Sequence, residues 1–393
     1  MELADIFRAH GHVFRAGHRL CGVQHRAMRA IAACRTVALG GHIAECDHCG
    51  AIHYTYHACR NRHCPKCQTQ ATERWLAARC RELLPVPYFH LVFTLPHTLN
   101  PLAQGSPRVI YALLFQAVAQ TLLEFGANPR WLGGKIGATL VLHTGGQTLT
   151  QPVHLHARVT GGALAVDGQW CAPRRGFLFP VKALSKVFCA KMLAGLANAF
   201  ASHSLELTGA TATLAAPTAQ QTLLRTLRVQ PWVVFAKSPM AGPAQVLEYL
   251  SRYTHRVALS HERLVAASAD SVQFRYKDDA HGGHRRVMTL MPEEFIRRFL
   301  LPVLPRGFVR IRHYGLTSSR DKQTRLDRCR QALDQPVLPQ PNPELQETLV
   351  DFGRRVAARD IERCPACHHG QLRWVATLIP YRPFARGPPL DSG

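Results

Sequence analysis

Residues 151–162 read QPVHLHARVTGG, and this stretch largely determines the fold that we predict for the middle of the chain. Its side chains alternate in character as in a β-strand, where successive residues point to opposite faces. His154 and His156 should therefore share one face, and two imidazoles on one face can bind a divalent cation. Taken alone the pair is a weak signal, because the chain contains 22 histidines and a chance surface pair is the simpler interpretation.

The segments around this pair predict an antiparallel sheet with flanking helices, which is an α+β fold. A second strand-like run, 138–143, precedes the pair, and the Gly-containing connection between them is typical of a β-hairpin. The run YFHLVFTLP (88–96) is apolar enough for a buried strand. Helices are expected from Pro107, with Ser106 as the cap, and over 181–200.

A second pair of residues stands in EYLSRYTHR (248–256). Tyr249 and Tyr253 are four residues apart on a predicted helix, so their phenols should lie on one face. They also form an apolar stripe with Val246 and Leu250, and such a stripe is usually a packed core. Spacing alone therefore leaves both interpretations open.

The cysteines predict metal binding. Cys46, Cys49, Cys64 and Cys67 form two Cys-x-x-Cys knuckles with fourteen residues between them, close to the spacing of a four-cysteine structural zinc site. Cys59 and His63 are further candidate ligands, so a second ion or another ligand set stays open. Cys364 and Cys367 form half of a second zinc site, for which the sequence identifies no partner.

The chain carries a net charge of +23 spread over its whole length, which indicates a polyanionic partner such as DNA. Arg60, Arg62 and Lys66 are woven through the second knuckle, where they could contact phosphates. In GFVRIRHYG (307–315) the alternation places Phe308, Arg310, Arg312 and Tyr314 on one strand face, suited to single-stranded DNA. Solvated surfaces are the alternative for both groups.

Three consecutive parts are expected. Residues 1–85 are rich in Cys and His and should form a zinc-binding DNA-recognition domain. Residues 86–333 should form the largest domain, and a Pro-rich linker and basic tail with a Cys-x-x-Cys pair occupy 334–393. Residues 1–17 lack the pattern of a secretory signal, and the apolar stretch 109–125 carries a polar face, so we expect a cytoplasmic protein without a membrane span.

The strand bearing His154 and His156, followed by the helix bearing Tyr249 and Tyr253, resembles the HUH nucleases. Specifically, it resembles the two-tyrosine transposases of rolling-circle insertion sequences (insertion sequence 91 type). The resemblance runs through nearly the whole chain in one order. The matching segments are GGHIAECDHCG, CRNRHCPKCQ, FTLPHTLNPLA, VLHTGGQTL, HLHARVTGG, FLFPVKALSKVF, VLEYLSRYTHRVALS and GFVRIRHYGL.

The resemblance implies an HUH-nuclease-like sheet and a metal-assisted attack by Tyr249 or Tyr253 on a DNA phosphate, leaving a 5′-phosphotyrosine. The metal would be Mg²⁺ or Mn²⁺, held by His154, His156 and a third ligand. Gln147 is the first choice for that ligand, with His143 and Glu248 as alternatives. Arg256, beside the tyrosines, is a candidate phosphate contact.

The implied partner is DNA, chiefly single-stranded or hairpin transposon ends, and action as an oligomer on DNA stays open. Three other functions also remain open. They are a zinc-dependent DNA-binding regulator, a replication initiator or conjugative relaxase, and an inactive protein that only binds transposon ends. The chain has no Gly-x-x-x-x-Gly-Lys-Ser/Thr phosphate loop, which argues against a fused helicase.

Overall fold

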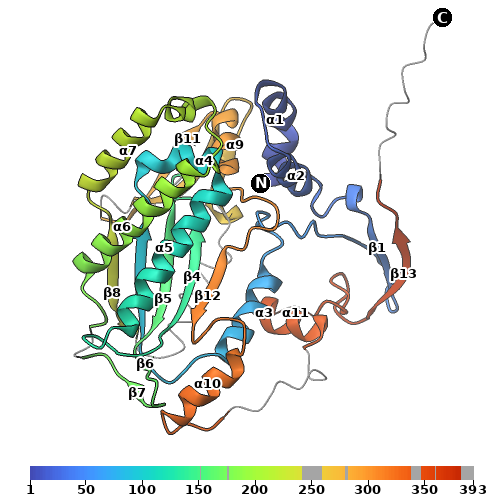
Figure 1. Ribbon diagram of the computed structural model, residues 1–393. Helices are drawn as coiled ribbons and strands as arrows, with labels where there is room; N and C mark the ends of the chain where they lie inside the picture. The colour runs from blue at the N-terminus through green and yellow to red at the C-terminus, as the bar shows by residue number, and fades with distance from the viewer. Residues whose placement is uncertain are drawn as a thin grey trace, which may run out of the picture. The chain divides into compact units, whose positions relative to one another are not determined.

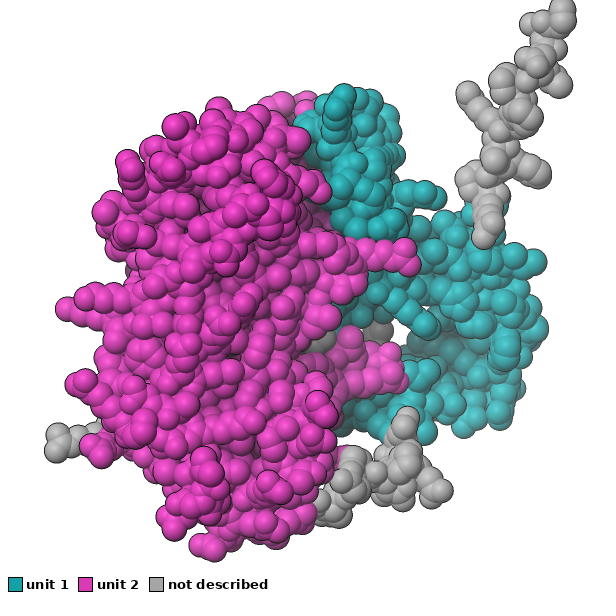
Figure 2. Space-filling view, in the orientation of Figure 1, with its two compact units in different colours: residues 1–69, 339–393 teal, residues 70–338 magenta. Residues whose placement is uncertain are grey.

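The computed structural model describes residues 1–150, 152–174, 177–240, 259–278, 282–337, 347–358 and 360–381. The chain forms two compact units, residues 1–69 with 339–393 and residues 70–338, which Figure 2 shows in different colours. The C-terminal segment therefore belongs to the same unit as the N-terminal segment, whereas the sequence predicted a separate tail. Sequence order could not show this, because residues in contact, such as Asp47 and Gln371, are more than 300 positions apart in the chain.

The smaller unit contains helices and a three-stranded antiparallel sheet. Strand β1 is central, with β13 on one side and β2 on the other. Two helices at the start of the chain pack together through buried apolar residues such as Phe7 and Met28. The elements are α1 (Leu3–Gly17), α2 (Gly22–Ala33), β1 (Gly41–Cys46), β2 (Ile52–Tyr56), α11 (Leu349–Ala357) and β13 (Leu372–Leu378).

The larger unit is built on a five-stranded sheet in which all neighbouring strands are antiparallel, in the order β12-β4-β5-β3-β8 (Figure 1). Strand β5 is in the middle, so its backbone is held by a partner on each side. The strands are β3 (Tyr88–Thr94), β4 (Gly137–His143), β5 (His154–Thr160), β8 (Val234–Met240) and β12 (Ile311–Gly315).

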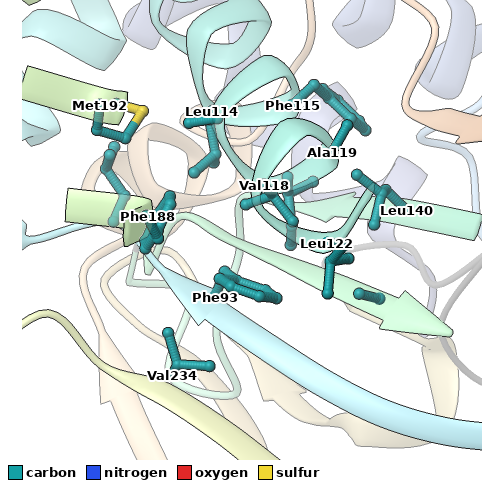
Figure 3. Close-up of a cluster of buried hydrophobic side chains, with 14 of the residues drawn as sticks. Phe93, Leu114, Phe115, Val118, Ala119, Leu122, Leu140, Phe188, Met192 and Val234 are labelled. Atoms are coloured by element: carbon teal, nitrogen blue, oxygen red, sulfur yellow. The ribbon is translucent and has the colours of Figure 1, made fainter. Parts of the chain in front are cut away.

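One face of this sheet is covered by the long helices α5 (Pro107–Ala127) and α6 (Val181–Ala201), as Figure 1 shows. Alternate residues of β3, β4 and β5 point into the core beneath these helices, among them Phe93 and Leu140. The rings of Phe188 and Phe93 pack edge to face, with their centres 5.3 Å apart (Figure 3). Such buried aromatic side chains stabilise the unit, since replacing one by Ala typically lowers the free energy of unfolding by about 3–5 kcal/mol.

Helices α5 and α6 are long and apolar enough to cross a membrane by length and composition alone. Both contribute many side chains to the core on the sheet, as helices of a globular domain do. Gln116, Gln120 and Glu124 of α5 are exposed together, which confirms the polar face expected from their spacing. Ser106 precedes α5 as expected, but its hydroxyl accepts a hydrogen bond from the Glu206 backbone instead of capping the helix.

The remaining elements of the larger unit surround the sheet or form smaller sheets. Strands β9, β10 and β11 form an antiparallel meander, and the turn between β9 and β10 contains Asp270. The elements are α3 (Thr69–Cys80), α4 (Asn100–Gly105), β6 (Ala163–Leu164), β7 (Trp170–Cys171), α7 (Pro217–Val229), β9 (Leu264–Ala267), β10 (Val272–Asp278), β11 (His284–Leu290), α9 (Pro292–Leu300) and α10 (Lys322–Gln331). The predicted α+β class, with a small cysteine-rich module, is confirmed.

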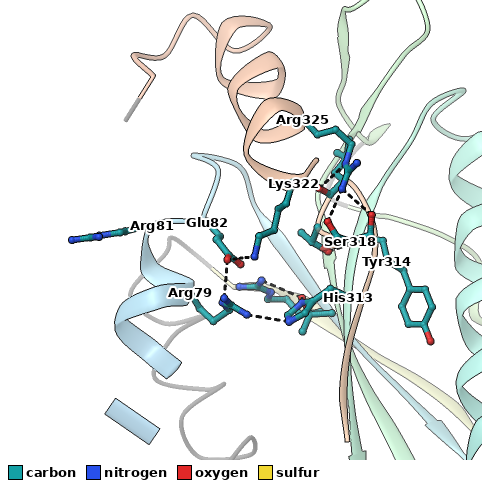
Figure 4. A network of polar contacts seen from close by, with 12 residues as sticks. Arg79, Arg81, Glu82, His313, Tyr314, Ser318, Lys322 and Arg325 are labelled. Carbon is teal, nitrogen blue, oxygen red and sulfur yellow. Dashed lines mark hydrogen bonds and ion pairs between the residues drawn. The ribbon is translucent and has the colours of Figure 1, made fainter. Parts of the chain in front are cut away.

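The second face of the sheet carries polar side chains. At its β12 end, Arg79 donates hydrogen bonds to Nε2 of His313 (3.1 Å) and to Glu82 (2.8 Å), and Lys322 also pairs with Glu82 (Figure 4). Because Arg79 can only donate, Nε2 of His313 must be unprotonated, and Nδ1 donates to Thr139 (3.0 Å). His313 is therefore a neutral imidazole inside a cationic network.

Acid should destabilise the fold through His313. Burial, followed by the charges of Arg79, Arg158 and Lys322, lowers the pKa of His313 to about 3. The stability that the neutral ring contributes is therefore fully present above the unfolded pKa of about 6.5. As pH falls from there towards 3, the free energy of unfolding decreases by about 1.4 kcal/mol per pH unit. Urea unfolding at pH 7 and pH 4.5 should show a smaller acid loss in His313→Gln than in wild type. An equal loss in both proteins would disprove the assignment.

Candidate metal and nucleic-acid site

Three histidines meet at one end of the polar sheet face. His154 and His156 lie on β5, two residues apart, and point away from the helix-covered core, as their spacing predicts. His143 ends β4 directly opposite His154. The Nε2 atoms of His154 and His156 are 3.0 Å apart, and the ring of His143 lies 4.3 Å from that of His156. One nitrogen from each ring lies within 4.8 Å of a nitrogen of each of the other two rings. Ligand atoms bound to a single metal ion are separated by similar distances.

These imidazoles are held in the form that binds metals. Burial lowers the pKa of His154, and burial followed by the neighbouring His143 lowers the pKa of His156. Both rings should therefore be neutral at physiological pH, with a lone pair available for a cation. Burying several polar rings away from water costs free energy, and a bound cation would offset that cost by interacting with their lone pairs.

A fourth histidine belongs to the same cluster, and the sequence analysis missed it. His90 lies on β3, is 2% exposed, and its Nε2 is 2.9 Å from Nδ1 of His156. Burial, followed by the charge of Lys237, lowers its pKa to about 4. Its polar ring in the apolar run YFHLVFTLP was the available signal. A partner on Nδ1 holds the ring of His156 in place and leaves its Nε2 towards His154.

The third ligand predicted from the sequence, Gln147, lies in the turn between β4 and β5, where its backbone carbonyl accepts a hydrogen bond from Arg263. The histidine brought to the pair is His143, which was the reserve candidate. Gln147 as a ligand stays a prediction. Glu248, the tyrosines Tyr249 and Tyr253, and Arg256 lie outside the described residues.

The cysteines form two four-membered groups in the smaller unit, and this corrects the predicted zinc site. Cys64 and Cys67 are grouped with Cys34 and Cys59, while Cys46 and Cys49 are grouped with Cys364 and Cys367. The structure therefore places the two adjacent knuckles in different groups. Cys34, which ends α2, supplies the thiol that the sequence analysis did not consider. Cys59 is a member, as allowed for, whereas His63 is not in either group.

The thiols in both groups include members held ready to ionise. A hydrogen bond from Cys64 is the main cause that lowers the pKa of Cys59 to about 5. The backbone N–H of Gly370, followed by that of His369, lowers the pKa of Cys367 to about 5. Thiolates are the form that binds zinc, so the chemistry of these groups fits the metal expected for such cysteine sets.

The predicted basic contacts have different surroundings. Arg60 and Arg62 are exposed beside the Cys59–Cys67 knuckle, where phosphates could reach them. Lys66 forms an ion pair with Glu2, which offsets its charge. All three stay predictions as DNA contacts.

The predicted base-stacking face of 307–315 is wrong for Phe308. This residue precedes β12 and is 5% exposed within the core. Arg312 and Tyr314 do share a face, but it is the face beneath the helices, where the guanidinium of Arg312 lies 4.3 Å from the ring centre of Phe115. Alternation identifies residues that share a face and does not say which face is covered. Phosphate contacts by Arg310 and Arg312 stay predictions.

Comparison with known proteins identifies the family of the chain and a zinc-binding domain in its N-terminal part. Residues 6–95 match the zinc-binding model of insertion sequence 91 transposases, described as "Transposase zinc-binding domain", and residues 137–325 match a model described as "Putative transposase". A Sinorhizobium fredii protein named "Putative transposase y4qJ" is 46% identical over 94% of each chain. The chain belongs to the insertion sequence 91 family of transposases. Another relative of this transposase, the transposase for insertion sequence element IS801 from Pseudomonas savastanoi pv. phaseolicola, is 26% identical over 93% of this chain and 87% of that one.

This transposase was also compared with solved structures. A metal-bound conjugative relaxase TrwC in complex with oriT DNA is 15% identical, with 43% of this chain and 71% of the relaxase covered and a TM-score of 0.24. A copper-bound structure of the relaxase TrwC with oriT DNA is 16% identical, with 42% of this chain and 68% of the relaxase covered and a TM-score of 0.22. Scores at this level do not establish a common fold.

Proposed function

We propose that this transposase nicks and rejoins single-stranded DNA at the ends of a mobile element through a metal-assisted 5′-phosphotyrosine intermediate. The observation that carries the proposal is the convergence of His143, His154 and His156 at one place on the sheet. A DNA-binding regulator would have no need for three clustered imidazoles there. Membership of a transposase family supplies the substrate class.

In this proposal His143, His154 and His156 hold one divalent cation, Mn²⁺ or Mg²⁺, with Gln147 as a further candidate ligand. Such a cation, when bound, stabilises negative charge that develops on the scissile phosphate. Three imidazoles favour Mn²⁺ over Mg²⁺, because Mg²⁺ prefers oxygen ligands more strongly. His90 acts as a positioning residue that holds Nδ1 of His156.

The nucleophile is the phenol oxygen of Tyr249 or Tyr253. Its oxygen forms a bond to phosphorus, the bond from phosphorus to the 3′ oxygen breaks, and the leaving oxygen takes up a proton as the phenol gives one up. The products are a 5′-phosphotyrosine and a free 3′ hydroxyl, so the phosphodiester energy is kept for rejoining. Two tyrosines would allow one to hold an end while the other makes the next cut.

DNA binding draws on the net charge of +23 and on the zinc-binding module. We propose that residues 1–85 contribute to recognition of single-stranded or hairpin ends, with Arg60 and Arg62 at the phosphates. The site of action would be the bacterial cytoplasm at the nucleoid, and the chain could act as an oligomer on the DNA.

The experiment is an adduct assay on the full chain. Purified protein is mixed with a single-stranded oligonucleotide that spans the element's end, in buffer with and without added Mn²⁺, and the products are separated on a denaturing gel. We expect a protein–DNA adduct only with Mn²⁺, mapped by mass spectrometry to Tyr249 or Tyr253. The same sequence as a duplex is the control and should give little adduct.

Two results would contradict the proposal. Cleavage that leaves a free 5′ phosphate and no protein-linked strand would indicate a hydrolytic nuclease. Tight binding of the oligonucleotide with no cleavage at any Mn²⁺ concentration would indicate a regulator or an inactive end-binding protein.

A further inference from the structure

We propose that Cys46, Cys49, Cys364 and Cys367 bind a second structural zinc ion that joins the two ends of the chain. We call this group the terminal clasp. It is separate from the Cys34, Cys59, Cys64 and Cys67 group. The proposal does not depend on the nuclease chemistry. It also reaches beyond the matched zinc-binding domain, which covers residues 6–95, because half of the ligands come from the C-terminal segment.

The spacing of the sulfur atoms fits a tetrahedral zinc ion. The Sγ atoms of Cys46 and Cys367 are 3.7 Å apart, and those of Cys49 and Cys364 are 3.8 Å apart. Zinc–sulfur bonds of about 2.3 Å in a tetrahedron place sulfur atoms about 3.8 Å from one another. Disulfides would require about 2.05 Å, and all four cysteines are free. The four thiols are therefore arranged as ligands of one ion.

The two halves of the clasp have the same backbone conformation. The amide of Gly50 donates to the carbonyl of Cys46, and the amide of His368 donates to that of Cys364, each at 3.0 Å. Gly50 and His368 both adopt positive φ, 68° and 58°. A non-glycine residue rarely adopts this conformation, so the turn at His368 is held by its surroundings. Repetition of one turn in segments so far apart in sequence indicates a shared structural task.

Backbone amides point at the sulfur atoms, as a bound thiolate requires. Amide nitrogens lie 3.4–3.5 Å from the thiols of three of the four cysteines. Such N–H donors stabilise negative charge on sulfur. The donors are His48 to Cys46, Ala366 to Cys364, and His369 and Gly370 to Cys367.

Packing around the clasp leaves no room for a side chain at Gly370. A Cβ atom there would lie 2.5 Å from Sγ of Cys46 and 2.6 Å from Cβ of His48. Asp47 accepts a hydrogen bond from the amide of Gln371 at 2.7 Å and pairs with Arg373 at 3.3 Å. Contacts other than those between the cysteines therefore also hold the two knuckles together.

The clasp continues directly into the strand pair β1–β13, where Cys46 lies opposite Leu372. The zinc would thus fix the end of the sheet at which β13 enters. Since ligands 315 residues apart close the site, the zinc-binding module can be completed only after residue 367 has been synthesised. A chain that ends before Cys364 should retain the first zinc site and lack the second.

The first test is the zinc content of the full-length protein, measured by native mass spectrometry and elemental analysis. Two cysteine groups predict two zinc ions per chain. Cys364→Ser/Cys367→Ser should retain one zinc, and Cys21→Ser/Cys80→Ser, which changes two exposed cysteines outside both groups, should retain two. Retention of two zinc ions by Cys364→Ser/Cys367→Ser would overturn the proposal, and so would one zinc in wild type.

Two further measurements guard against variants that fail to fold. Gly370→Ala keeps every ligand but should lose the clasp zinc to a chelator much faster than Gly17→Ala, where a Cβ meets nothing within 4 Å. In wild type, thiol alkylation with progressive chelation should expose Cys46, Cys49, Cys364 and Cys367 together. Alkylation of Cys364 and Cys367 while Cys46 and Cys49 stay protected would show that they do not share an ion.

Discussion

The double variant Tyr249→Phe/Tyr253→Phe should form no covalent adduct with DNA, a loss of at least about 10³-fold in strand cleavage. Phenylalanine keeps the ring and its packing but lacks the oxygen that would bond to phosphorus. DNA binding and zinc content should be unchanged, because neither depends on those oxygens. The measurement is the rate of adduct formation with Mn²⁺ on a single-stranded end.

The single variants separate the roles of the two tyrosines. If each phenol can attack, either single variant should still form an adduct, mapped to the remaining tyrosine. Tyr276→Phe on β10 is a matched control and should behave as wild type. An adduct of undiminished yield in the double variant would rule out both tyrosines as nucleophiles.

His156→Ala should abolish binding of the catalytic cation and lower the cleavage rate by about 10³-fold or more. His156 is the centre of the cluster, since its two nitrogens lie 3.0 Å from His154 and 2.9 Å from His90. Without it the remaining imidazoles cannot hold an ion in the same place. His313→Gln, which changes a partly buried histidine of the same sheet outside the cluster, should keep full cation binding. Equal cleavage by His156→Ala and wild type would contradict the assignment.

His90→Gln distinguishes a positioning residue from a ligand. Loss of a partner that orients a ligand typically weakens metal binding by about 10–100-fold. Cleavage by this variant should therefore recover at high Mn²⁺, whereas cleavage by His156→Ala should not. A defect in His90→Gln that no Mn²⁺ concentration relieves would indicate a direct role in the reaction.

Much of the larger unit could be predicted from local sequence. The apolar run of β3 and the long helices α5 and α6 follow from patterns within a single segment. The shared face of His154 and His156 follows from strand periodicity. These features need no knowledge of distant contacts, because a period of two or of 3.6 is set by the backbone itself.

The features that depend on distant contacts were missed. Spacing identifies Cys46 and Cys49 as a pair but cannot say that their partners stand 315 residues later. His90 reads as one polar residue in a buried strand until β5 is placed beside it. The face of Arg312 likewise depends on which side α5 covers. In each case the decisive information lies in tertiary packing.

The central claim is that one divalent cation binds to the clustered imidazoles. The most direct measurement is electron paramagnetic resonance of the full-length protein titrated with Mn²⁺, with detection of couplings to ligand nitrogen. We predict one bound Mn²⁺ per chain with imidazole nitrogen couplings, both absent in His156→Ala and both present in His313→Gln. Mn²⁺ bound without nitrogen couplings, or bound equally well by His156→Ala, would contradict the account.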